Sequence, residues 1–151
     1  MSHLHGFPDL PPVWAAGTAL AQWAASAVVP LVRVDAAWLD ALGGALALAG
    51  LALAAWSAWW FRHKRTPIMP RERPTALIVE GPYRVNRNPI YSAMALVLLG
   101  LAAMFGTLAA LLLAGAFVAV ITQRFVRGEE AALRAAFGPE AERYFARTRR
   151  W

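Results

Sequence analysis

Four long apolar runs constrain this chain more than any other feature of its sequence. They cover residues 13–32, 41–61, 89–105 and 107–125. A helix needs about 20 apolar residues to cross the hydrocarbon core of a bilayer, and only helices and closed barrels satisfy their backbone groups there. The sequence therefore predicts an all-α integral membrane protein, one domain over residues 1–151, with about four transmembrane helices and a C-terminal amphipathic helical tail.

Composition agrees with this interpretation. The chain is 59% hydrophobic and 16% charged, which favours a membrane protein over a soluble one. The net charge of +6 does not indicate nucleic-acid binding, because the basic residues stand beside the apolar runs. With no cysteine, thiolate chemistry and cysteine metal sites are excluded. His3 and His5 have no third ligand nearby in the sequence, so no metal site is expected.

Residues 1–61 read as a two-helix scaffold. Gln22 and Ser26 lie four apart and are expected to hydrogen-bond another helix, while Pro30 is expected to kink the first helix near its end. A stripe of small residues in the second run predicts close packing against a neighbouring helix; its members are Gly43, Ala47, Gly50 and Ala54. Trp56, Trp59 and Trp60 are typical of an interfacial belt.

Residues 62–151 carry the polar connection, a helical hairpin and the tail. Prolines 67, 70 and 74 argue against a continuous helix in the connection. Pro89 suits a first helical turn, and Thr107 can cap the fourth helix, which we expect to end near Phe125. Gly138-Pro139 separates two short helices of the tail, which lie on the membrane surface or fold over the bundle.

Basic residues are unevenly distributed among the polar segments. Of the 15 Lys and Arg residues, seven lie in 62–88, seven follow residue 123, and Arg33 alone separates the first two runs. With four spans both basic segments fall on one side. The positive-inside rule then places them, and both termini, in the cytoplasm of a bacterial-type inner membrane.

Two motifs resemble a known family. GPYRVNRNPIY at 81–91 is followed by the apolar hairpin and then by EEAALRAAFGPEAERY at 129–144 and a closing RRW. From about residue 66 to residue 151 the chain is similar to the isoprenylcysteine carboxyl methyltransferases and phospholipid methyltransferases of membranes. The resemblance implies a methyltransferase that binds S-adenosyl-L-methionine between the connection and the tail. It implies cofactor-binding roles for Leu77, Ile78, Tyr83, Asn88, Pro89, Tyr91 and Glu129.

The sulfonium cation of that cofactor suits aromatic faces and a carboxylate. The acceptor, lipophilic or lipid-linked, is left open. Arg124 and Arg127 could orient a carboxylate acceptor, and Glu130 or Tyr91 could take a proton from a phospholipid amine. Asn88 stands where eukaryotic carboxyl methyltransferases usually have histidine, which weakens the isoprenylcysteine alternative.

Two other classes remain open from sequence. One is a membrane reductase of the steroid-reductase-like type, which would use a reduced nicotinamide cofactor. The other is a non-catalytic assembly protein, whose stability would depend on the small-residue stripe of the second helix. Membrane lipids are expected partners in every case, and the oligomeric state is left open.

Overall fold

The computed structural model describes residues 9–151, so His3 and His5 lie outside the described residues. Within this range the chain forms helices and no strand. The elements are α1 (Pro11–Val28), α2 (Ala37–His63), the 3-10 turn η1 (Gly81–Arg84), α3 (Pro89–Phe105), α4 (Leu108–Ile121), the π turn η2 (Thr122–Val126), α5 (Arg127–Phe137) and α6 (Pro139–Arg147). The all-helical prediction is confirmed.

Local sequence signals set most helix ends. Pro89 begins α3, and the Thr107 hydroxyl caps α4 by accepting from the backbone N–H of Ala110 at 3.3 Å. Gly138 separates α5 from α6 as predicted. The predicted kink at Pro30 is wrong, because α1 already ends at Val28. The residue before a proline avoids helical backbone angles, so the helix stops instead of bending.

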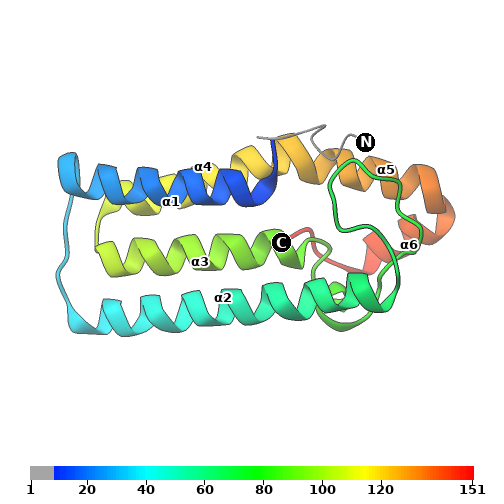
Figure 1. Ribbon diagram of the computed structural model, residues 1–151, viewed down its shortest axis with the longest axis horizontal. Coiled ribbons are helices and arrows are strands. Elements are labelled where there is room, and N and C mark those ends of the chain that lie inside the picture. The colour runs from blue at the N-terminus through cyan, green and yellow to red at the C-terminus, as the bar shows by residue number, and fades with distance from the viewer. Residues whose placement is uncertain (1–8) are drawn as a thin grey trace, which may run out of the picture.

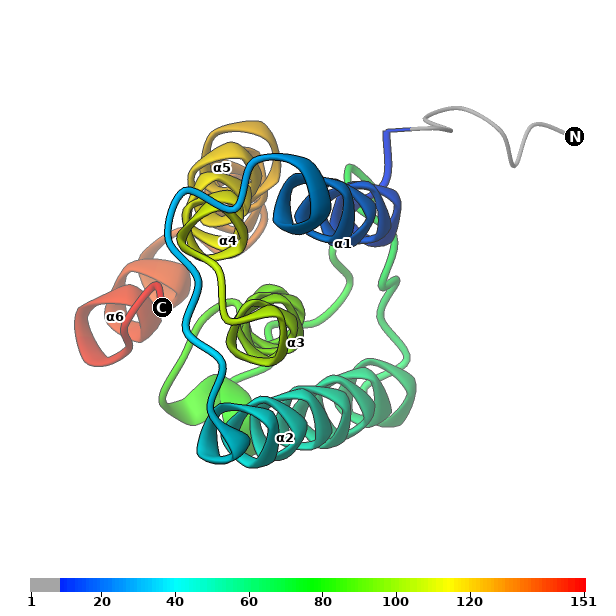
Figure 2. The same cartoon turned by 90° about the vertical axis from the view of Figure 1, so that its left-hand side faces the viewer.

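The four long helices lie side by side, and α3 occupies the middle (Figure 1). Seen end-on, α2 lies on one side of α3 and the pair α1 and α4 on the other (Figure 2). The small-residue stripe of α2 packs against α3. A Cβ built on Gly50 would stand 2.7 Å from the carbonyl oxygen of Ala93, and one on Gly43 would stand 2.5 Å from that of Gly100. Backbones this close require glycine, which confirms the predicted close packing.

The distribution of polar side chains is the reverse of that in a soluble bundle. Gln22 is fully buried and donates from Nε2 to the carbonyl oxygens of Leu98 (3.0 Å) and Ala110 (2.9 Å). The hydroxyl of Ser26 is hydrogen-bonded to that of Thr107 at 2.7 Å. Large apolar side chains point outward instead, among them Leu20, Trp23, Leu48, Leu51 and Trp56. Such a surface is stable against lipid.

Among residues 9–151, two helices are long and apolar enough to cross a membrane. They are α2, with 27 residues, and the continuous segment Leu108–Phe137, with 30. At about 1.5 Å per residue they measure roughly 40 and 45 Å. The fourth helix does not end near Phe125 as predicted, since η2 carries it directly into α5. A π turn keeps the backbone hydrogen-bonded, so no break is required.

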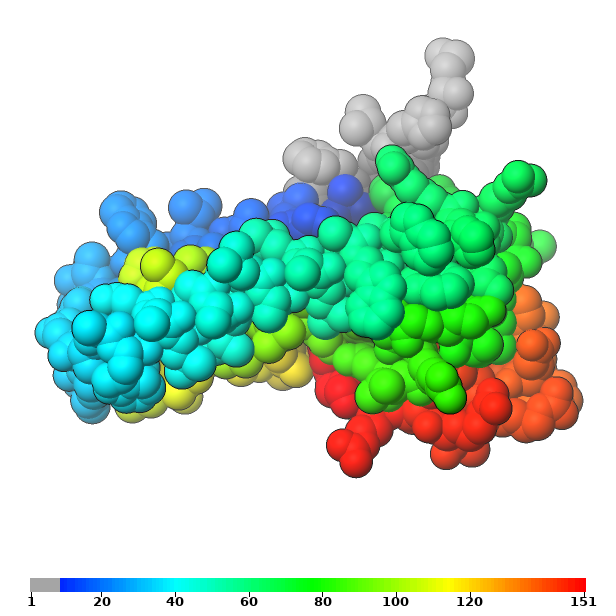
Figure 3. Space-filling model, turned by 90° about the horizontal axis from the view of Figure 1, so that it is seen from below, coloured from blue at the N-terminus to red at the C-terminus, as the bar shows by residue number. Residues whose placement is uncertain are grey.

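The two ends of the bundle differ. At one end, the connection between α1 and α2 pairs with the α3–α4 turn, where Val34 N–H donates to Gly106 C=O at 2.8 Å and Leu108 N–H to Val32 C=O at 3.0 Å. At the other end lie the 64–88 connection, α5 and α6, which broaden the molecule (Figure 3). Both basic segments of the sequence therefore gather at one end, as predicted.

Candidate functional site

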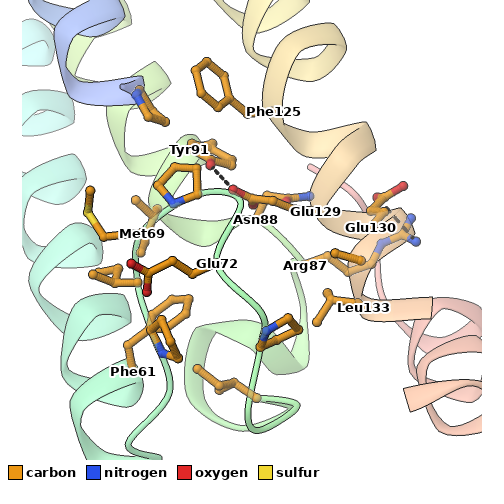
Figure 4. Close-up of a pocket in the computed structure, with 18 of the residues that line it drawn as sticks. Phe61, Met69, Glu72, Arg87, Asn88, Tyr91, Phe125, Glu129, Glu130 and Leu133 are labelled. Carbon is orange, nitrogen blue, oxygen red and sulfur yellow. Dashed lines mark hydrogen bonds and ion pairs between the residues drawn. The ribbon is translucent and has the colours of Figure 1, made fainter. Parts of the chain in front are cut away.

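A cavity of about 420 Å³ opens at the basic end of the bundle. Its walls come from the start of α1, the end of α2, the connection, the start of α3, and the η2–α5 segment (Figure 4). The lining is mostly apolar with a few polar groups, and the volume falls in the range of about 300–1,000 Å³ common for small-molecule sites. The cavity therefore has the size and character of a cofactor site.

The sequence-predicted residues converge on this cavity. All seven residues assigned to the cofactor line it: Leu77, Ile78, Tyr83, Asn88, Pro89, Tyr91 and Glu129. Arg124 and Glu130 also line it. Arg127 is exposed and lies outside the lining. The π turn Thr122–Val126 changes the helical register between these two arginines, and Arg124 and Glu129 line the cavity while Arg127 does not.

Tyr91 and Glu129 form the polar centre of the cavity. Tyr91 lies in the first turn of α3 and is buried, and its hydroxyl donates to Oε1 of Glu129 at 2.5 Å. The bond joins the start of α3 to α5 (Figure 4). The ring of Phe125 lies beside that of Tyr91, with centroids 6.5 Å apart. A carboxylate held next to aromatic rings is suited to a cationic ligand.

Tyr83 offers an unused polar atom. Its side chain is buried, and its hydroxyl has no hydrogen-bond partner among residues 9–151. The carbonyl oxygen of Tyr83 is fixed by the Tyr144 hydroxyl, which donates at 2.7 Å. Burial, followed by the nearby Tyr144 and Glu129, raises the pKa of the Tyr83 phenol well above its ordinary value. The group stays protonated at neutral pH and is free to donate to a ligand.

Glu130 is held in an ion-pair network. Its carboxylate is 3% exposed and accepts from Arg150 Nε at 2.9 Å and from a terminal Arg150 nitrogen at 2.7 Å. A terminal nitrogen of Arg87 lies 3.7 Å away. Two guanidinium groups stabilise the ionised carboxylate, which makes it a weak proton acceptor.

Further hydrogen bonds fix residues 149 and 150 against the segment just before α3. Arg87 N–H donates to Arg149 C=O at 2.8 Å, and Arg149 N–H donates to Val85 C=O at 3.1 Å. Asn88 Nδ2 donates to Arg150 C=O at 3.0 Å. We call the segment 149–151 with Glu130 the C-terminal clasp. Asn88 therefore has a structural partner in the clasp as well as a place in the cavity wall.

Hydrogen bonds and an ion pair fix the 64–88 connection, which forms the opposite wall of the cavity. Thr66 Oγ1 accepts from Thr75 N–H at 3.1 Å, and Lys64 forms an ion pair with Glu80. Burial opposes ionisation of Glu80, but the hydrogen bonds from Lys64 and from the Val79 N–H outweigh it and lower the pKa of that carboxyl. These contacts hold a proline-rich segment in place without a helix.

Trp60 also packs against the connection. Its indole lies so close to Gly81 (φ +56°) that a Cβ there would fall 1.9 Å from Nε1. Trp60 thus has an internal packing role, whereas Trp56 and Trp59 remain about half exposed, as an interfacial belt requires.

Three charged groups meet beside the cavity. Asp9 accepts from Arg71 and from Nε of Arg124, each at 2.5 Å. Hydrogen bonds from Arg124 and then Arg71 hold the pKa of Asp9 well below its ordinary value. Sequence reasoning assigned no role to Asp9, Arg71, Glu72, Arg87 or Arg150 at this site. Two of them lie within the quoted motifs, Arg87 in GPYRVNRNPIY and Arg150 in the closing RRW.

These features define a helical membrane protein with a small-molecule site at its basic end. Residues 38–140 match the model of the phospholipid methyltransferase family. The chain belongs to this family, which confirms the resemblance read from the two motifs. Comparison with curated proteins and with solved structures gave no match. Membership supports a membrane methyltransferase of the phospholipid or isoprenylcysteine type.

Proposed function

We propose that the protein transfers a methyl group from S-adenosyl-L-methionine to a lipid acceptor. This proposal rests on the convergence of all seven residues implied by the family resemblance on one cavity, whose polar centre is the Tyr91–Glu129 pair. The cofactor would supply an electrophilic methyl group on a sulfonium. The residues of the cavity fit such a cation, since a carboxylate and aromatic rings stabilise it.

Named residues fit the remaining parts of the cofactor. The unpartnered hydroxyl of Tyr83 is available to a polar group of the ligand, and the apolar side chains of Leu77 and Ile78 offer a surface for its adenine. Glu72 adds a second carboxylate to the lining. Methyl transfer is an in-line displacement whose main requirement is positioning, so a rigid cavity with no nucleophilic side chain suffices.

The geometry also separates the two residues proposed as proton acceptors for an amine. Glu130 is occupied by Arg150 and lies near Arg87, which leaves it a positioning role. The Tyr91 hydroxyl donates a hydrogen bond to Glu129. When the Tyr91 oxygen accepts a proton from the amine, Tyr91 can therefore pass its own hydroxyl proton to the Glu129 carboxylate. We therefore assign proton acceptance to the Tyr91–Glu129 pair. Arg124 remains the candidate for orienting an anionic group of the acceptor.

We also propose four membrane spans, α1, α2, α3 and α4, with the cavity at the cytoplasmic side. The grouping of both basic segments at one end of the bundle supports this orientation. In a bacterial cell the membrane would be the inner membrane. There the cavity would face both soluble cofactor and membrane lipid.

Calorimetric titration of S-adenosyl-L-methionine into the detergent-purified protein tests the proposal. We expect saturable binding that Glu129→Ala weakens by roughly 10-fold or more, because hydrogen bonds and contacts to charged groups contribute about 1.5–3 kcal/mol. Glu140→Ala is the matched control, since Glu140 is an exposed acid of α6 outside the cavity. Absence of binding to folded wild type, or binding of reduced nicotinamide cofactor instead, would contradict the proposal.

A further inference from the structure

A second hollow, of about 560 Å³, lies between α1 and α4. These two helices run side by side along the outside of the bundle (Figure 2). The lining is Asp9, Val13, Trp14, Gly17, Thr18 and Ala21 on the α1 side and Leu113, Ala116, Phe117, Val120 and Arg124 on the α4 side. We call this hollow the α1–α4 groove. Its walls are apolar along most of their length and charged at one end.

Three small residues, Gly17, Ala21 and Ala116, are among those that line the groove. A Cβ built on Gly17 would meet nothing within 4 Å, so packing does not require glycine there. Alanine is the better helix former, so helix stability does not favour this glycine either. Together with Ala21 and Ala116, Gly17 keeps the space between the two helices open.

The groove meets the cavity of the candidate site at one residue. Arg124 lines both hollows, and its guanidinium lies 5.5 Å from the ring centroid of Trp14. Asp9 accepts hydrogen bonds from Arg124 and Arg71. Two guanidinium groups and one carboxylate leave one net positive charge at this end. An apolar channel that ends in a positive charge complements an acyl chain that ends in a phosphate.

We propose that the α1–α4 groove binds one acyl chain of a phospholipid, with the phosphate at Arg124 and the rest of the headgroup reaching into the cavity. This inference rests on the proposed function, because it identifies the acceptor as a phospholipid. A phospholipid held this way would enter sideways from the bilayer, while the cofactor occupies the cavity beyond Arg124.

Photo-cross-linking in detergent tests the groove without relying on activity. The probe is phosphatidic acid that carries a diazirine in one acyl chain, and its neutral counterpart is diacylglycerol with the same chain. We expect saturable labelling by the charged probe within residues 13–21 and 113–120. We expect Gly17→Leu to raise half-saturation roughly 10-fold, because overpacking a filled site costs that much. Gly115→Leu is the matched control, since Gly115 faces open space on α4 outside both hollows.

A substitution at Arg124 tests whether the phosphate binds there. Arg124→Gln should reduce labelling by the charged probe to the level of the neutral one. Equal labelling by both probes in wild type, or an equal effect of Gly17→Leu and Gly115→Leu, would overturn the inference. Cofactor titration of the wild type separates the two proposals, and Gly17→Leu should keep wild-type cofactor affinity because Gly17 does not line the cavity. In the wild type, cofactor binding without saturable groove labelling rejects only the groove, and saturable labelling without cofactor binding rejects only the methyltransferase assignment.

Discussion

Removing Arg150 should destabilise the whole basic end of the bundle. Arg150 supplies two hydrogen bonds, of 2.9 and 2.7 Å, to Glu130, which is 3% exposed. Breaking a buried ion pair by removing one partner costs about 3–5 kcal/mol. Here the Arg150 side chain is 39% exposed, and Arg87 remains 3.7 Å from the carboxylate. Both facts reduce the cost, and we expect Arg150→Ala to lose about 2–3 kcal/mol.

Thermal unfolding in detergent, followed by circular dichroism, measures this loss. A domain of this size loses about 2–4 °C of Tm per kcal/mol, so Tm should fall by roughly 4–12 °C. Arg149→Ala is the control, since that side chain is exposed and contributes to the clasp through its backbone. Cofactor affinity should fall as well, because the clasp holds Asn88 in the cavity wall.

A double-mutant cycle measures the coupling energy between Arg150 and Glu130. Glu130→Ala alone should cost about as much as Arg150→Ala, because each leaves charge behind without its partner. The double variant leaves no orphaned carboxylate, so its loss should fall below the sum of the two single losses by about 1–2 kcal/mol. Strict additivity, or a Tm for Arg150→Ala equal to that of Arg149→Ala, would refute a buried ion-pair clasp.

Three further predictions follow from the bundle. Gly50→Leu should cost about 1–3 kcal/mol or more through overlap with the α3 backbone, whereas Gly44→Leu, which faces open space, should leave Tm nearly unchanged. Gln22→Leu removes two interhelical hydrogen bonds and should cost about 1–2 kcal/mol in the same thermal assay. Because the native chain has no cysteine, single variants report topology: an impermeant maleimide should label Asp35→Cys in intact cells, and Arg73→Cys only after lysis.

The sequence predicted the helices well because the causes of a membrane helix are local. Backbone groups in lipid must be satisfied within the segment, so an apolar run of sufficient length becomes a helix. Pro89 and Thr107 mark helix starts through their own backbone and side-chain chemistry. The exception is the region near Phe125, where a π turn lets one helix continue into the next. No apolar pattern reports such a turn.

Most of the candidate site also came from sequence, through two motifs that resemble a family. That resemblance implied roles for seven residues, all of which line one cavity, although nothing local shows that residues 77–91 and 129 meet. Arg124 and Arg127 were both candidates to orient a carboxylate acceptor because both stand just before the acid pair Glu129-Glu130. The wider π turn leaves Arg127 exposed and turns Glu129 toward the cavity.

Only the tertiary structure decided the contacts between distant segments. Asn88 meets Arg150 across 62 positions of sequence, and Gln22 meets its carbonyl partners across 76 and 88. Tertiary packing also forms the groove between α1 and α4 and joins it to the cavity at Arg124. The physical reason is that a side chain's residue type fixes what it can bond to, whereas the packing of helices around α3 fixes which partner is within reach.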